Sequence, residues 1–185
     1  MTPDFLLDYV DFSVDELAII GAKFHEKTIP KGHTFLGEGA ICEQVAFVRE
    51  GSLYLSQIQE DGTERLLDFF TPGDFVSDYY SYLTRSETDT RITAYRASTL
   101  WTLHRRDALT FYDTLPTYQA LGRILAEKAF IQLATSIKSM GHKPIERYQL
   151  LATQRPQVIQ TFPQYMIASY LGMSPEWLSK IRGRA

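Results

Sequence analysis

Glycines punctuate the first half of the chain at a spacing that strongly limits its fold. Gly32, Gly39, Gly51, Gly62 and Gly73 follow one another at intervals of 7 to 12 residues. Short runs of β-branched and aromatic residues, such as 44–48 and 52–58, lie between them. Short strands separated by turn residues at this spacing are typical of an antiparallel sandwich or barrel. We therefore expect a β-rich body over residues 25–104.

One turn in this body can be assigned from its residues. Asp61 and Gly62 lie between two strand-like runs, and an Asp-Gly pair supplies the positive φ angles that a tight hairpin turn requires. Further strand-like runs at 91–95 and 99–103 continue the pattern. The expected fold class is therefore α+β, with an antiparallel sandwich or barrel as its β-part.

Short helices are predicted on both sides of the β-rich body. Before it, Ser13 and Glu16 form a capping box, in which each side chain satisfies a backbone donor of the other residue. An opening helix is expected to follow. After His104, Asp107 is expected to cap a short helix through Tyr112.

A much longer helix is predicted next, because Pro116 suits a first helical turn. Apolar residues then recur at the helical spacing of three or four positions, at Tyr118, Leu121, Leu125, Ala129, Leu133, Ile137 and Met140. This stripe predicts a helix of about 25 residues that ends at Gly141 and restarts after Pro144. Ile124 and Ile131 add a second apolar flank. A symmetric dimer seam would cover that flank, and the alternative is a monomeric helix buried on two sides.

The end of the chain has the spacing of a helix-turn-helix. Ala168 and Leu171 suit the inner face of a helix, and Gly172 follows where a left-handed residue can reverse the chain. Ser174 and Pro175 then suit the N-cap and first residue of a second helix. Two short helices joined in this way form the helix-turn-helix unit. The alternative is a helical hairpin with an ordinary solvated face.

In such a unit the first residues of the second helix meet the base edges in the DNA major groove. Glu176 can accept a hydrogen bond from cytosine, and Lys180 can donate to guanine. Arg182 and Arg184 are expected to bind phosphates, which gives affinity without sequence information. The complete set of predicted DNA contacts is Gln164, Tyr165, Ser174, Pro175, Glu176, Ser179, Lys180, Arg182 and Arg184.

The charge of the chain is unevenly distributed around a net value of -3. Residues 1–140 hold 13 Lys and Arg against 20 Asp and Glu, whereas residues 141–185 hold 6 against 2. An acidic body with a basic end is typical of a protein whose end faces a polyanion, and chance unevenness is the alternative.

The composition argues against several other classes. No apolar segment approaches the roughly 18 residues that a membrane helix needs, and the first residues lack the pattern of a secretory signal. Cys42 is the single cysteine, which excludes a disulfide framework and a cysteine cluster for zinc or iron–sulfur. We expect a cytoplasmic protein without metal or cofactor, with Cys42 buried in the core. Haem ligation is the alternative, by one of His25, His33, His104 and His142.

Catalytic motifs are missing from the sequence. It contains no Gly-x-Ser-x-Gly elbow, phosphate loop or Rossmann fingerprint. His33 has no partner at metal-ligand spacing in the β-rich body. We therefore expect no enzyme. The remaining rival to a DNA-binding protein is a small-ligand-binding or interaction module with a degenerate helix-turn-helix that does not bind DNA.

Two segments resemble a known family. Residues 164–182 resemble the DNA-binding end of the Crp/Fnr transcriptional regulators, and Pro72-Gly73-Asp74-Phe75 resembles the entry to the phosphate-binding cassette of their cyclic-nucleotide-binding roll. The order of elements agrees over nearly the whole chain. With Ala185 close behind the second helix, the β-wing of this family is expected to be absent or reduced.

The resemblance implies three parts: a cyclic-nucleotide-binding-like β-roll sensor domain at 1–115, a dimerisation helix at 116–140 and a helix-turn-helix domain at 141–185. It further implies that the roll is an antiparallel double-stranded β-helix (a jelly roll). It also implies a homodimer that binds a two-fold symmetric operator in double-stranded DNA. A small-molecule effector in the roll and RNA polymerase are the further candidate partners, and no membrane is involved.

The predicted effector pocket departs from the family pattern. A cyclic-nucleotide cassette uses a Gly-Glu pair to hold the ribose and an Arg followed by Ser or Thr to bind the phosphate. The best-matching positions here are Ser77-Asp78 and Thr88-Asp89, and an acid at the phosphate position would repel the ligand. Cyclic AMP is therefore not the expected effector, and the pocket holds another small molecule or is closed. The predicted pocket residues are Ser77, Asp78, Arg85, Thr88, Asp89 and Arg91, where either arginine would need a register shift to bind an anion.

Overall fold

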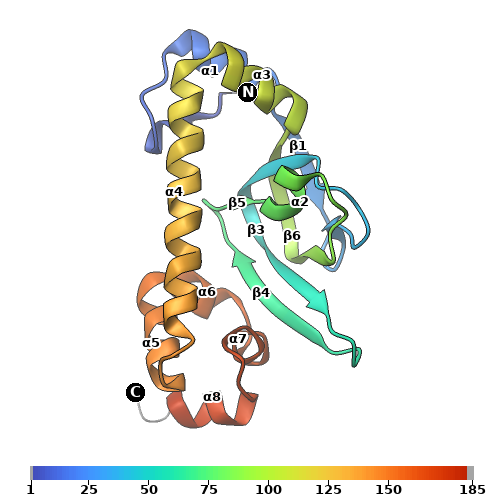
Figure 1. The fold of residues 1–185 in the computed structure, drawn as a ribbon, viewed down its shortest axis with the longest axis vertical. Coiled ribbons are helices and arrows are strands. Elements are labelled where there is room, and N and C mark those ends of the chain that lie inside the picture. Colours follow the sequence, from blue (N-terminus) through green and yellow to red (C-terminus); the bar gives the residue numbers. More distant parts are fainter. Residues whose placement is uncertain (1, 183–185) are drawn as a thin grey trace.

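The chain folds into a β-roll, a long helix that runs beside it, and a helical end (Figure 1). The structure, a computed structural model, describes the backbone of residues 2–182 and the side chains of residues 2–180. The elements are, in order, η1 (Asp4–Asp8), α1 (Val14–Gly21), β1 (His25–Ile29), β2 (Thr34–Leu36), β3 (Gln44–Ile58), β4 (Glu64–Phe70), β5 (Phe75–Val76), α2 (Tyr79–Thr84), β6 (Thr90–His104), α3 (Arg105–Thr114), α4 (Pro116–Ser139), α5 (Pro144–Gln154), α6 (Pro156–Thr161), α7 (Gln164–Leu171) and α8 (Pro175–Arg182).

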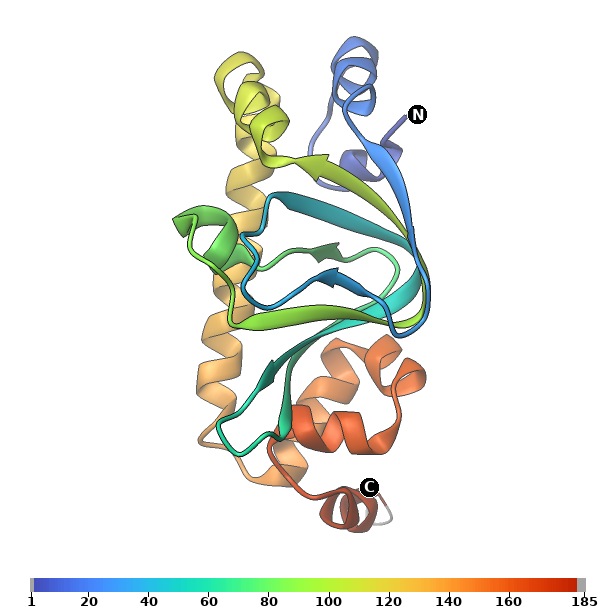
Figure 2. The same ribbon diagram turned by 90° about the vertical axis from the view of Figure 1, so that its right-hand side faces the viewer.

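Two strands of 15 residues, β3 and β6, form the frame of the roll. They pair antiparallel along almost their whole length, from Gln44 opposite His104 to Gln57 opposite Thr90. The strand order is β1-β6-β3-β4, and β2 and β5 add to β6 and β3 respectively. Figure 2 shows these strands curling around a common interior. The expected α+β class with an antiparallel roll is confirmed.

Gly51 explains why β3 is one strand where the sequence predicted two runs. Its φ is +88°, and a Cβ at this position would lie 2.3 Å from the carbonyl oxygen of Ala97. The register of β3 against β6 shifts between Val48 and Ser52. The glycine therefore lets the strand bend sharply without leaving the sheet.

Local sequence signals account for several element ends. The backbone N–H of Ser13 donates to Glu16 Oε2 at 2.8 Å, and the N–H of Glu16 donates to Ser13 Oγ at 3.3 Å, so the capping box is confirmed. In the hairpin between β3 and β4, Gly62 has the expected positive φ, +80°, whereas Asp61 keeps a negative φ and its carboxylate accepts from the N–H of Thr63 at 2.9 Å. Pro116 lies in the first turn of α4. These signals act through neighbouring backbone groups and need no tertiary contact.

The start of α3 differs from the expectation. His104 caps this helix, because its Nδ1 accepts a hydrogen bond from the N–H of Arg106 at 3.2 Å. Asp107 lies inside the first turn, where its Oδ1 pairs with Lys23 Nζ at 3.2 Å. The predicted Asp107 cap is therefore wrong: β6 runs directly into the helix, so its last residue takes the capping position. Pro156 begins α6 shortly after α5 ends at Gln154.

The apolar clusters of the described residues lie in three places. One fills the roll and includes Cys42, which is buried as expected. Another packs η1, α1, α3 and the start of α4 against Trp101 and Leu103 of β6. The third joins β4 to the helical end, with Phe69 against Phe162. The helical end is thus anchored on the β3–β4 hairpin of the roll.

α4 is buried at its start and exposed further along. Tyr118 and Leu121 are in the core, whereas Phe130 is 71% exposed and Ile137 is 57% exposed. None of the described helices is both long and apolar enough to span a bilayer.

Candidate nucleic-acid interface and effector site

α7 and α8 cross closely, as the sequence predicts for a helix-turn-helix. Gly172 adopts a φ of +66° after α7, and the N–H of Met173 donates to the carbonyl oxygen of Ala168 at 2.9 Å. Ala168 and Leu178 are fully buried at the crossing. Ser174 accepts a hydrogen bond from the N–H of Trp177 at 3.2 Å, so it caps α8 as expected.

The predicted DNA contacts of α7 and α8 are exposed wherever their side chains are described. On α7 these are Gln164 and Tyr165, and at and after the turn they are Ser174, Pro175, Glu176, Ser179 and Lys180. The side chain of Arg182 and the whole of Arg184 lie outside the described residues. Trp177, 44% exposed on the same helix, is a further candidate contact that the sequence reasoning left without a role.

On this surface Glu176 is an ionised hydrogen-bond acceptor near the cation Lys180. The pKa of the Glu176 carboxyl is lowered by the N–H of its own residue, then by the Ser174 hydroxyl, and last by the charge of Lys180. Glu176 is therefore a carboxylate at neutral pH, able to accept hydrogen bonds and unable to donate one.

At the predicted effector pocket, Asp78 is surrounded by donors from its own segment. Its Oδ1 accepts from the N–H of Ser81 at 3.1 Å, and its Oδ2 accepts from the Thr90 hydroxyl at 3.3 Å and from the Thr88 hydroxyl. The hydroxyls of Thr88 and Thr90 are also 2.8 Å apart. Both threonines are buried, so this cluster satisfies its polar groups internally.

The other predicted pocket residues point elsewhere. Asp89 is exposed and accepts from Gln57 Nε2 at 2.6 Å, and Arg91 Nη2 lies 3.3 Å from Glu38. Ser77 Oγ donates to the carbonyl oxygen of Gln44 at 3.3 Å. The structure therefore brings Asp78 and Thr88 together and directs Asp89 and Arg91 to other partners.

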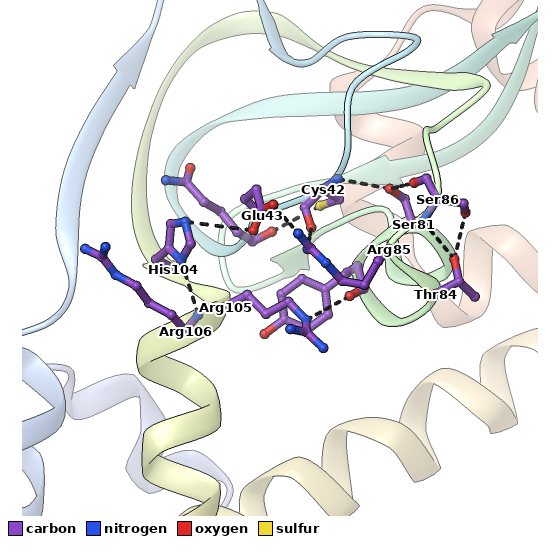
Figure 3. Close-up of polar contacts among 11 residues, drawn as sticks. Cys42, Glu43, Ser81, Thr84, Arg85, Ser86, His104, Arg105 and Arg106 are labelled. Atoms are coloured by element: carbon purple, nitrogen blue, oxygen red, sulfur yellow. Dashed lines mark hydrogen bonds and ion pairs between the residues drawn. The ribbon is translucent and has the colours of Figure 1, made fainter.

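Arg85 belongs to a polar network at the rim of the roll (Figure 3). It ends α2 with a left-handed φ of +66°, and its guanidinium donates to the Glu43 carboxylate and to the carbonyl oxygen of Cys42. The pKa of Glu43 is lowered, chiefly by this hydrogen bond. Ser81 Oγ accepts from the N–H of Cys42 at 2.9 Å, so α2 is tied to the start of β3.

A separate cavity of about 520 Å³ lies between the roll and α4. Of the six predicted effector residues, Ser77 lines it and the other five do not. Its wall includes six tyrosines, namely Tyr9, Tyr79, Tyr82, Tyr112, Tyr118 and Tyr170. Sequence reasoning missed this cavity because its walls come from separate segments of the chain.

At one end of the cavity an ion-pair cluster joins the roll to the helical end. Arg155 Nη1 lies 2.5 Å from Asp68 Oδ1, and its Nη2 donates to the carbonyl oxygen of Phe69 and lies 3.7 Å from Asp74. Asp68 Oδ2 also accepts from Gln132 Nε2 of α4 at 3.1 Å. We call Arg155, Asp68 and Asp74 the hinge cluster. Both aspartates line the cavity.

The described residues contain no group of three or more His, Cys, Asp and Glu side chains that could hold a metal ion. The polar side chains of Asp78 and Arg155 have hydrogen-bond or ion-pair partners within the protein.

Comparisons with known proteins agree with this architecture. Residues 26–114 match the family model of the cyclic nucleotide-binding domain. A search of curated proteins finds no match for the chain.

Several solved structures share the fold. The catabolite activator protein of Thermus thermophilus is 18% identical, with 97% of this chain and 85% of that chain covered and a TM-score of 0.61. FixK2 from Bradyrhizobium japonicum is 18% identical, with 87% and 83% covered and a TM-score of 0.69. A regulator assigned to the crp/fnr family from Eubacterium rectale is 16% identical, with 94% and 83% covered and a TM-score of 0.70. The similarity therefore extends beyond the roll to the helical end.

Proposed function

The chain combines a cyclic nucleotide-binding domain with the overall fold of Crp/Fnr transcriptional regulators, and on this premise we propose that it is a homodimeric DNA-binding regulator. The observation that carries the proposal is the exposed start of α8 above a tightly packed helix crossing. Ala168 and Leu178 fix the crossing, and Glu176 and Lys180 remain outside it. A regulator of transcription works where the chromosome is, so a cytoplasmic location belongs to the same proposal.

The division of roles on this surface follows from the chemistry of DNA. Glu176 and Lys180 lie near the start of α8, where a recognition helix meets base edges. Gln164 and Tyr165 begin α7 and suit phosphate contacts. The excess of 6 Lys and Arg over 2 Asp and Glu in residues 141–185 would supply the non-specific attraction.

The dimer is proposed along α4. Ala126, Phe130, Leu133, Ile137 and Met140 are exposed and follow one another at alternating intervals of four and three residues. This heptad spacing is that of a coiled-coil seam. The sequence suggested Ile124 and Ile131 for a second flank. Ile131 is exposed on a different side of the helix from this seam, and the longer heptad is the stronger candidate.

The seam can be tested with a matched pair of substitutions. Ile137→Glu places a charge in the seam and should convert a dimer to a monomer in sedimentation or light scattering. Ile131→Glu makes the same change at a similarly exposed position outside the seam and should leave the dimer intact. A monomeric native chain, or a dimer that survives Ile137→Glu, would contradict this seam.

DNA binding is tested by an electrophoretic shift with the DNA upstream of the protein's own gene and with random duplex. We expect affinity to fall steeply as salt rises, because phosphate contacts release counterions. Lys180→Ala should reduce the preference for the upstream DNA by about tenfold, the order expected for one base contact. Arg184→Ala should weaken binding to both DNAs about equally.

The control is Lys31→Ala, which removes an exposed lysine from the roll and should change neither affinity nor preference. Absent or salt-insensitive binding would favour the alternative of an interaction module with a degenerate helix-turn-helix. Equal losses on both DNAs for Lys180→Ala would refute its role in base recognition.

We also propose that the roll does not respond to cyclic AMP. Asp78, Thr88 and Thr90 satisfy one another where the ribose and phosphate would bind, and Arg85 and Arg91 pair with Glu43 and Glu38. Titration calorimetry with cyclic AMP should detect no binding at millimolar ligand. Saturable binding would overturn this part of the proposal without affecting the DNA result.

A further inference from the structure

The cavity between the roll and α4 has a wall of phenol side chains that suits a ligand. Tyr79 and Tyr82 come from α2, Tyr112 from α3 and Tyr118 from α4. The ring centroids of Tyr112 and Tyr118 are 5.0 Å apart, and those of Tyr79 and Tyr82 are 6.2 Å apart. Tyrosines from three separate helices therefore line one space.

The hydroxyls of Tyr82 and Tyr118 stay protonated, and that of Tyr118 is free to meet a ligand. Burial raises the pKa of Tyr118 far above its ordinary value and that of Tyr82 to about 12. Tyr118 is 6% exposed, yet no hydrogen bond in the described part of the chain involves its hydroxyl. Tyr118 lines the cavity, so a ligand that carries a hydrogen-bonding group can pair with this hydroxyl.

The charges around the cavity disfavour an anion. Asp68 and Asp74 line it, and both pair with Arg155. Lys128 is the lining cation among the described residues, and its Nζ lies over the ring of Tyr9, 4.3 Å from the centroid. A nucleotide phosphate would therefore meet two carboxylates and one lysine. Apolar groups such as Leu121 and Leu125 make up much of the remaining wall.

The cavity also reaches the helical end of the molecule. Tyr170 of α7 lines it, together with Asp68 and Asp74 of the hinge cluster. The pKa of Tyr170 is raised by burial first and by the charge of Asp68 second, and the Arg155 guanidinium opposes this shift. The wall of the cavity is therefore complete while α7 and Arg155 remain docked on β4.

We propose that this cavity binds an uncharged, largely apolar small molecule that carries a hydrogen-bonding group, and that the bound ligand holds the helix-turn-helix in its docked position. This site is distinct from the Asp78–Thr88–Thr90 cluster. Its volume of about 520 Å³ lies within the roughly 300 to 1,000 Å³ that is usual for small-molecule pockets. A second copy of the chain belongs on the heptad seam, and most of the seam residues do not line the cavity. The regulatory part of this inference rests on the proposed function, and ligand binding itself does not.

The first test uses N-phenyl-1-naphthylamine, an uncharged aromatic amine that fluoresces in apolar surroundings, and the full chain without DNA. We expect saturable binding. Ala129→Phe fills the cavity wall and should weaken the dye at least tenfold. Ala134→Phe makes the same change on α4 away from the cavity and should alter affinity less than twofold. Ser136→Phe, at an exposed position of the wall, serves as a second filling variant if Ala129→Phe does not fold.

Several results would contradict a ligand site in this cavity. Native affinity in a folded wall variant, or an equal loss in Ala134→Phe, would place the dye elsewhere. Dye binding that disappears as the protein associates at higher concentration would show that a second copy fills the cavity. Displacement of the dye by cyclic AMP would contradict the exclusion of anions.

The second test concerns coupling to the helical end. Two linked equilibria affect each other equally, so opening the hinge cluster must weaken a ligand that favours the docked state. Arg155→Ala should therefore weaken the dye about fivefold, whereas Arg123→Ala, which removes an exposed arginine of α4, should leave it unchanged. Unchanged dye affinity in a folded Arg155→Ala chain would refute the coupling. Because these readouts need no DNA, their failure can be told apart from failure of DNA binding.

Discussion

Asp68 and Asp78 are only ten residues apart in the roll, but the hydrogen-bond partners of their side chains lie at very different distances along the sequence. Asp78 takes its partners from Ser81, Thr88 and Thr90, at most 12 residues away. Asp68 accepts from the N–H of its neighbour Phe69, and it also takes partners from Gln132 and Arg155, which are 64 and 87 residues away. The first aspartate closes a local segment, and the second joins the roll to the long helix and the helical end.

The difference matters for how such a chain can be regulated. A carboxylate whose hydrogen bonds are all made within its own segment stabilises the roll, but it does not link the roll to a movement of another element. A carboxylate shared between three distant elements changes its contacts whenever one of them moves. We therefore expect the contacts of Asp78 to stabilise the roll. We expect the contacts of the hinge cluster to change when the helical end moves relative to the roll.

The largest effect is expected when the apolar packing between β4 and the helical end, next to the hinge cluster, is removed. Phe69 is fully buried, and its ring centroid lies 4.3 Å from that of Phe162 and 5.3 Å from that of Tyr170. Phe69→Ala should lower the free energy of unfolding by about 3 to 5 kcal/mol, measured by chemical denaturation of the helical end. Phe130→Ala, at an exposed position of α4, is the control and should cost under about 1 kcal/mol in the monomer at low protein concentration. Similar losses in both variants would contradict this packing.

A somewhat smaller effect is expected from the buried ion pair. Arg155→Ala leaves Asp68 and Asp74 without their cation and should cost about 3 kcal/mol. Arg123→Ala breaks an exposed pair with Glu127 and should cost under about 0.5 kcal/mol. Hydrogen exchange would then show faster opening of α7 with the roll still protected. Equal protection in both parts would refute this role of the hinge cluster.

Alkaline pH tests the roll side of the comparison. Burial raises the pKa of Tyr82 from 10.0 to about 12, so folding favours its protonated form. The resulting stability is fully present below pH 10 and is lost as pH rises through about 12, a change of up to about 3 kcal/mol. Denaturation at a series of pH values should show this decline, and Tyr82→Phe should reduce it. The same decline in Tyr82→Phe would assign the titration to other groups.

The smallest effect is expected at Asp78. Asp78→Asn keeps the shape of the side chain and weakens hydrogen bonds from Thr88 and Thr90, which should cost about 1 kcal/mol. Melting of the roll would measure the loss, while exchange of α7 should stay unchanged. Asp68→Asn is the matched variant in the hinge cluster and should speed exchange in α7. The reverse pattern would exchange the roles of the two aspartates.

The predicted effector residues show which part of a site a local sequence pattern can identify and which part it cannot. The sequence drew attention to Ser77, Asp78, Arg85, Thr88, Asp89 and Arg91 because they occupy the positions of a known cassette. Whether Arg85 faces a ligand depends on Glu43, which lies 42 residues earlier. No local pattern identifies that partner, so the role of these residues as an effector pocket stays a prediction.

Much of the architecture was within reach of the sequence because its signals are local. The Ser13 capping box and the left-handed Gly62 and Gly172 each depend on neighbouring backbone groups. The spacing of strands and the apolar stripe of α4 follow from the periods of strand and helix. The one wrong cap, at Asp107, arose where β6 and α3 join without a loop.

The sequence by itself determined the order of the elements and the exposed start of α8, since helix ends, turns and periodicity are written in adjacent residues. The tertiary structure alone decided that Asp78 is satisfied internally, that Arg155 joins Asp68 and Asp74, and that tyrosines from separate elements surround one cavity. Those contacts depend on strand register and on where distant helices pack, and residues many positions apart carry no local signal of their partner.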